Sequence, residues 1–86
     1  MYKNKTAEGR NNLCGLQVKK QRQAMQPKVS QKKLADLLQN EGLDLDKNAV
    51  QRIESGQRFV TDIELKIIAK VLRVSYQALL DASDDL

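Results

Sequence analysis

The sequence contains no histidine and a single cysteine, Cys14. One cysteine cannot form an internal disulfide, and a chain without histidine lacks the commonest general base and a common metal ligand. Neither a nucleotide-binding glycine loop nor a cluster of metal ligands is present, so we expect no bound metal, no cofactor and no enzymatic activity. Cys14 follows Leu13 in an apolar stretch and is interpreted as a packing residue, with a redox switch as the alternative.

Aromatic residues are also scarce, at 3% of 86 residues, although 41% of the chain is apolar. The core must therefore be aliphatic, which favours packed helices over a sheet. No apolar run approaches the roughly 20 residues that span a membrane, and the N-terminus lacks the apolar part of a signal peptide. We expect one cytoplasmic domain, large enough for a small core, with no membrane partner.

Positive charge is concentrated in the first third of the chain. Residues 1–33 contain nine Lys and Arg against one Glu, whereas residues 34–86 contain six against ten acidic residues. A basic segment of this kind can follow a phosphate backbone or an anionic membrane. Residues 1–10 have no apolar period and predict a flexible basic arm, for which a solvated tail is the alternative reading. Residues 83–86 are expected to form an acidic tail.

Helix signals divide the remaining chain into five segments. The first must end before Pro27, because the residue before a proline disfavours helical dihedral angles. Each of the other four begins at a cap residue that lies between two apolar residues spaced as in a hydrophobic staple. These cap residues are Ser30, Asp46, Thr61 and Ser75. The expected helices are 11–25, 30–41, 46–55, 61–72 and 75–82, which together form a compact all-α five-helix bundle of residues 11–82.

Apolar spacing also predicts which helix faces point inward. The first helix is expected to bury Leu13, Cys14, Val18 and Met25. The fourth helix is apolar over more than one face and is therefore expected to be the central core helix. Glu64, three residues after Thr61, completes a capping box at the start of that helix.

Residues 30–58 contain two short helical patterns joined by a connection with Gly42, a residue that can end a helix in the left-handed conformation. In the second pattern Val50 and Ile53 face inward. The outward residues are Lys47, Asn48, Gln51 and Arg52. Amides pair well with adenine, and Lys and Arg with guanine, so this segment predicts a helix-turn-helix whose second helix enters the major groove. An ordinary solvated helix face is the alternative for each of these residues.

Several motifs resemble the Cro/C1-type (XRE) helix-turn-helix family of phage and bacterial repressors. They are SQKKLADLL from Ser30, NAVQRIESGQR from Asn48 and TDIELKIIAKVLRVSYQALL from Thr61, and the resemblance covers about residues 13–81. It implies a lambda-repressor-like DNA-binding domain that acts as a dimer on a palindromic operator. The connection NEGLDLD is several residues longer than the family's usual turn, which can alter how deeply the third helix seats.

The resemblance also implies roles for individual residues. Lys47, Asn48 and Arg52 match base-reading positions, with Gln51 beside them. The expected contacts to the DNA backbone are Gln31, Lys32, Ser55, Gln57 and Arg58. Glu54, an acidic residue close to DNA, is expected to form a structural ion pair with an arginine of the first helix, here Arg22.

These patterns predict a sequence-specific DNA-binding transcriptional regulator, acting as a repressor and as a homodimer on double-stranded DNA. The apolar residues expected at the dimer surface, or alternatively in the core, are Tyr76, Leu79, Leu80 and Leu86. A second hypothesis is an antitoxin-like interaction module whose main partner is a protein.

Overall fold

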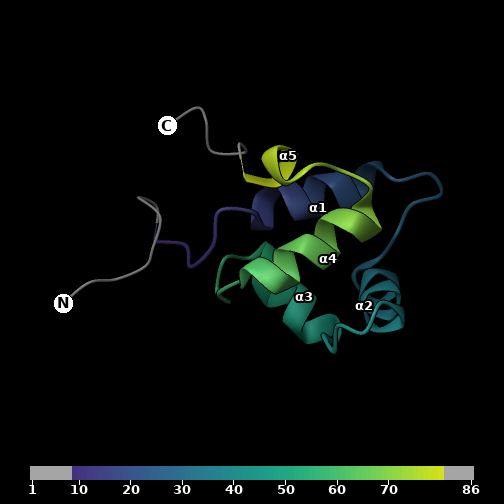
Figure 1. Cartoon of the computed structure of the whole chain (residues 1–86), viewed down its shortest axis with the longest axis horizontal. Helices are drawn as coiled ribbons and strands as arrows, with labels where there is room; N and C mark the ends of the chain where they lie inside the picture. Colours follow the sequence, from purple (N-terminus) through teal and green to yellow (C-terminus); the bar gives the residue numbers. More distant parts are fainter. Residues whose placement is uncertain (1–8, 81–86) are drawn as a thin grey trace.

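The computed structural model describes residues 9–80, whose helices enclose an aliphatic core (Figure 1). The helices are α1 (Gly15–Ala24), α2 (Gln31–Asn40), α3 (Lys47–Glu54), α4 (Asp62–Leu72) and α5 (Tyr76–Leu80). No strand occurs among the described residues, so the predicted all-α five-helix fold is confirmed. Residues 1–8 of the expected arm, residues 81–82 of the last expected helix and the tail 83–86 lie outside the described residues.

Four helices begin at the predicted cap residues. Side-chain oxygens accept hydrogen bonds from backbone N–H groups three residues ahead, which satisfies donors that a helix N-terminus leaves unpaired. The bonds are Lys33 N–H to Ser30 Oγ (3.0 Å), Ala49 N–H to Asp46 Oδ1 (2.8 Å), Glu64 N–H to Thr61 Oγ1 (3.2 Å) and Ala78 N–H to Ser75 Oγ (3.0 Å). The capping box at α4 is also formed. Local chemistry therefore determines these helix starts.

The first helix begins later than predicted, at Gly15 instead of residue 11. Asn12 Oδ1 accepts a hydrogen bond from Gly15 N–H at 2.8 Å, which holds the preceding residues outside the helix. Leu13 consequently points away from the core and is 44% exposed, so its predicted burial is wrong. Cys14 and Val18 are buried as predicted, and Met25 is partly buried.

Helix α4 contacts α1, α2 and α5, as expected of a central helix, but it is not buried on all sides. Only Ile68, Ala69 and Leu72 of this helix are buried, and Ile63 is 69% exposed. Helix α4 packs against α1, α2 and α5 (Figure 1), and Leu65, Ile67 and Val71 are partly buried against the core. None of the described helices is both long and apolar enough to cross a membrane.

Helix α3 packs against α2 and α1, and this packing decides which of its faces meets solvent. Helix α2 ends before Gly42, whose φ of 88° is the left-handed conformation expected there. Leu45 lies in the longer connection and is buried, while Gln39 Nε2 donates a hydrogen bond to Leu45 O at 3.1 Å. The additional residues therefore form a packed turn that seats α3 on the core.

Candidate nucleic-acid interface

The outward face of α3 carries the four residues predicted to read bases. Lys47, Asn48, Gln51 and Arg52 are all exposed on this helix. Val50 and Ile53, on the opposite face, are buried in the core, which fixes the rotation of α3 about its axis. Among the described residues, none of the four exposed side chains has a hydrogen-bond or ion-pair partner. Their polar groups are therefore available to a ligand.

A groove of about 410 Å³ lies between α2 and the start of α3. Its lining residues are Lys32, Ala35, Asp36, Gln39, Asp46, Lys47 and Asn48. Lys32, predicted to contact the DNA backbone, thus shares a surface with two predicted base-reading residues. Its ammonium group lies 3.4 Å from Asp36 Oδ1 in an exposed pair, which leaves the side chain free to reorient.

The predicted ion pair between Arg22 and Glu54 is confirmed, and it is buried. Arg22 Nε donates to Glu54 Oε2 at 2.7 Å, and Arg22 Nη2 donates to Glu54 Oε1 at 3.0 Å. Arg22 Nη1 donates to Val29 O at 2.9 Å, so the guanidinium has partners on three nitrogens. The carboxylate of Glu54 is thereby neutralised and faces α1 instead of the surface that carries Arg52.

Gln31, at the first turn of α2, is drawn into the same network. Its Nε2 donates a hydrogen bond to Glu54 Oε1 at 3.0 Å. One amide hydrogen of this predicted phosphate ligand is therefore directed at a carboxylate of α3. The bond aligns the N-terminus of α2, where backbone N–H groups and the helix dipole favour an anion, with the end of α3.

The loop after α3 holds the three other predicted backbone contacts. Ser55 and Gln57 are exposed, although Ser55 Oγ donates to Arg52 O at 3.2 Å. Arg58 has an internal partner that sequence reasoning missed: its Nη1 and Nη2 donate to the two carboxylate oxygens of Glu64 at 2.8 and 2.9 Å. These bonds hold the pKa of Glu64 below its usual range and raise the pKa of Arg58.

The backbone N–H groups of this loop already have partners within the molecule. The N–H groups of residues 55–58 all donate to carbonyls of α3, at distances of 2.8 to 3.2 Å. A phosphate beside the loop would therefore meet side chains, with Ser55 and Gln57 the most accessible.

Comparison with known families decides the class of protein. The helix-turn-helix family HTH_3 matches residues 18–79, which is more than half of the chain. The chain belongs to this helix-turn-helix family. The predicted resemblance to XRE-type regulators is confirmed, and the protein is a DNA-binding transcriptional regulator whose partner is double-stranded DNA.

The fold of this helix-turn-helix protein is similar to a solved structure, that of the restriction-modification controller protein C.AhdI from Aeromonas hydrophila. The TM-score is 0.63 and the sequence identity is 31%, over 76% of this chain and 84% of that chain. The comparison with curated proteins found no match. The family and this neighbour are regulatory proteins and not enzymes.

Other reactive groups in this helix-turn-helix protein lie away from the recognition surface. Cys14 is buried, and burial raises the pKa of its thiol to about 11. At neutral pH the sulfur is therefore a protonated packing group. The part of the chain described by the structure contains no group of His, Cys, Asp or Glu side chains suited to a metal ion.

Sequence reasoning missed one set of polar residues near α3. The sequence places Arg10 in the arm and Asn11 and Asn12 in the first helix. In the structure these residues lie against the carboxyl end of α3 and bind carbonyl groups of its last turn and of the loop after it. No local signal could have found them, because their partners are more than 40 residues away in the chain.

Proposed function

We propose that this regulator reads a specific operator with the outward face of α3 and represses transcription by occupying a promoter. The proposal rests on one combination: α3 exposes Lys, Asn, Gln and Arg side chains that have no partner among the described residues, and the Arg22–Glu54 pair fixes the helix on its core side. Lys47, Asn48, Gln51 and Arg52 offer the donors and acceptors that distinguish base pairs in the major groove.

Contacts to the DNA backbone flank this helix in the proposed complex. Gln31 and Lys32 lie on the first turn of α2, and Ser55 and Gln57 lie after α3. These residues would bind phosphates on either side of the groove and so fix the register of α3. Arg58 would add a phosphate contact only by reorienting from Glu64, so it contributes least to the proposal.

We further propose that the protein acts as a homodimer through the outer surface of α4 and α5. A groove of about 430 Å³ is lined there by Asp62, Ile63, Leu65, Lys66, Tyr76 and Leu80. Tyr76 and Leu80 are exposed, which supports their predicted role, whereas Leu79 is fully buried and belongs to the core. Leu86 lies outside the described residues. A two-fold dimer would present two copies of α3 to a palindromic operator.

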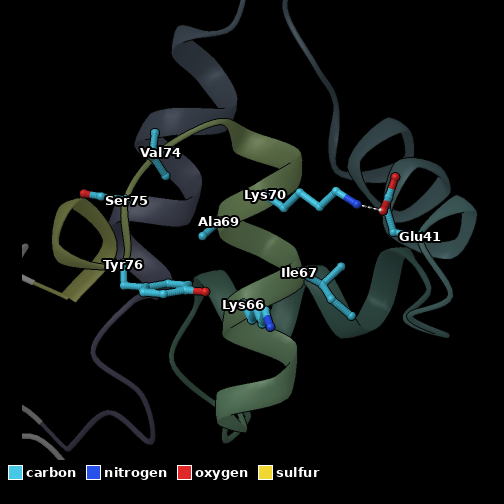
Figure 2. A pocket seen from close by; sticks show the side chains of 8 residues that line it. All are labelled: Glu41, Lys66, Ile67, Ala69, Lys70, Val74, Ser75 and Tyr76. Carbon is cyan, nitrogen blue, oxygen red and sulfur yellow. Dashed lines mark hydrogen bonds and ion pairs between the residues drawn. The ribbon is translucent and has the colours of Figure 1, made fainter.

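A second groove continues this apolar surface along α4 (Figure 2). The Tyr76 side chain points toward α4 and Lys66, and Lys70 donates to Glu41 at the end of α2 with 2.7 Å between Nζ and Oε1 (Figure 2). This exposed apolar surface also suits the second candidate function, an antitoxin-like module whose main partner is a protein.

Selection from a randomised DNA pool, sequenced after binding at low and at physiological salt, tests the proposal. Enrichment of one two-fold symmetric motif at both salts supports an operator-binding dimer and gives the half-site spacing. Binding that enriches nothing and disappears as salt rises reflects charge attraction alone and refutes it. The protein-partner hypothesis then takes precedence.

A further inference from the structure

The segment Arg10–Asn12, here called the strap, crosses the carboxyl end of α3. It donates hydrogen bonds to five carbonyl groups at the end of that helix and in the loop after it. They run from Arg10 Nη2 to Glu54 O (2.7 Å), Asn11 N to Gly56 O (2.7 Å), Asn11 Nδ2 to Gln57 O (2.8 Å), Asn12 Nδ2 to Ile53 O (3.0 Å) and Asn12 Nδ2 to Arg58 O (2.7 Å). The last carbonyls of a helix have no partner inside the helix. Arg10 supplies one for Glu54 O, and Asn12 adds a second donor to Ile53 O, which also accepts from Gly56 N–H.

Asn12 is the most constrained residue of the strap. Its side chain is buried, and its amide nitrogen bridges Ile53 O and Arg58 O. Its Oδ1 accepts from Gly15 N–H at 2.8 Å. One amide therefore joins the start of α1, the last turn of α3 and the loop before α4.

Two glycines allow the strap to approach α3 this closely. A Cβ atom at Gly15 would collide with Ile53 O, and one at Gly56 would lie 2.7 Å from the guanidinium carbon of Arg10. Gly56 also has a φ of 83°, which a residue with a side chain rarely adopts. The contact therefore requires glycine both at the start of α1 and in the loop after α3.

The strap acts on a short helix. Helix α3 has eight residues, and helices of this length are marginal in water without tertiary support. Asp46 caps its N-terminus, while the strap and the Arg22–Glu54 pair hold its other end. Arg52 lies in the last turn, one residue before a carbonyl that Asn12 binds.

We propose that Asn12 is a positioning residue for DNA reading: through the strap it holds the last turn of α3 and the loop 55–58 in the geometry that binds the operator. The inference rests on the proposed function of α3. Recognition groups that are already held in place lose less freedom on binding, so a loosened last turn weakens specific binding more than non-specific binding.

The test variant is Asn12→Ser. A serine hydroxyl can still accept the bond from Gly15 N–H but cannot bridge Ile53 O and Arg58 O. Asn40→Ser is the matched control, since Asn40 is exposed at the end of α2. Val18→Ala is the second control, because it opens the core from α1 without touching the strap. All proteins are compared at a temperature where circular dichroism shows them folded.

Two measurements decide the outcome. We expect the Kd of Asn12→Ser for the selected operator to rise about tenfold, while the Kd for scrambled DNA changes less than about twofold. In the free protein, amide hydrogens of residues 55–58 should exchange about tenfold faster relative to those of α4, as expected when a buried hydrogen bond is lost. Neither control should show either effect.

If Asn12→Ser loses affinity equally for operator and scrambled DNA, or if amide exchange rises as much in α4 as in residues 55–58, Asn12 contributes only stability. Either result would overturn the inference. A wild-type protein that does not distinguish the operator from scrambled DNA would refute the proposed function itself. The exchange measurement needs no DNA, so it shows separately whether the strap holds α3.

Discussion

Arg22 and Glu54 form a buried ion pair with two hydrogen bonds that joins α1 to the last turn of α3. The pair explains how an acidic residue can stand in a helix that faces DNA. Its charge is neutralised by a guanidinium on the core side, and Gln31 adds a third hydrogen bond to the same carboxylate. The pair therefore orients three helices relative to one another.

Removing one charge of this pair should strongly destabilise the fold. In Glu54→Gln the Arg22 charge stays buried without its counter-ion, and we expect a loss of about 3–5 kcal/mol in the free energy of unfolding. Urea denaturation measures it. Glu41→Gln is the control, because its pair with Lys70 is exposed and should contribute less than about 1 kcal/mol. Similar losses in both variants would contradict the structural role of the pair.

Arg52→Ala should weaken binding to the operator by about 1–3 kcal/mol and relax the preference at one base pair, if Arg52 binds a guanine. Competition binding against operators changed at single positions measures both effects. Lys20→Ala, on α1, controls for the loss of one positive charge. An equal loss on every DNA sequence would identify Arg52 as a phosphate contact instead.

The Arg58–Glu64 pair should make stability depend on pH in the acidic range. Hydrogen bonds from Arg58 lower the pKa of Glu64 in the folded protein. The stabilisation is therefore fully present above the ordinary carboxyl pKa of about 4.3 and is lost as the pH falls through the lowered value.

We expect Glu64→Gln to be less stable than wild type at pH 7, by about 1 kcal/mol, and the difference to shrink below about pH 4. Urea midpoints over a pH series measure it. Asp62→Asn, which changes an exposed carboxylate in the same helix turn, should show a smaller difference at pH 7. A Glu64→Gln difference that stays constant with pH would show that the ion pair is not its source.

Ile63→Glu should weaken the proposed dimer with little effect on the monomer, because Ile63 is 69% exposed. Placing a charge in a dimer interface leaves it desolvated and unpaired. Sedimentation equilibrium over a range of concentrations measures association. Gln23→Glu introduces the same charge at an exposed position of α1 and should leave association unaltered. If both variants associate like wild type, the dimer surface lies elsewhere.

The thiol of Cys14 should resist alkylation in the folded protein. Burial raises its pKa to about 11, so little thiolate exists at pH 8, and the sulfur is also covered. Iodoacetamide labelling followed by mass spectrometry should show slow modification that becomes fast in urea. Rapid labelling of the native protein would reopen the redox interpretation of this residue.

Much of the fold could be predicted from the sequence because its signals are local. Ser30, Asp46 and Thr61 bind backbone N–H groups three residues ahead, and the apolar period of α3 depends on residues within two turns. The same period predicts the outward face that carries Arg52. Only the resemblance to the family predicted the Arg22–Glu54 pair, because those residues lie 32 positions apart.

Other features depended on how the helices pack. Leu13 looks like a core residue in the sequence, yet it is exposed because Asn12, bound to Ile53 O of α3, delays the start of α1. Arg58 looks like a phosphate ligand, but the first turn of α4 brings Glu64 within hydrogen-bond distance of it.

The sequence by itself determined where four helices begin and which face of α3 turns outward, since both depend on neighbouring residues. The tertiary structure decided what holds the end of α3. The strap residue Asn12 binds carbonyls 41 and 46 positions away, and no periodicity or cap motif relates residues so distant. Such contacts exist only after the core has brought α1 and α3 together.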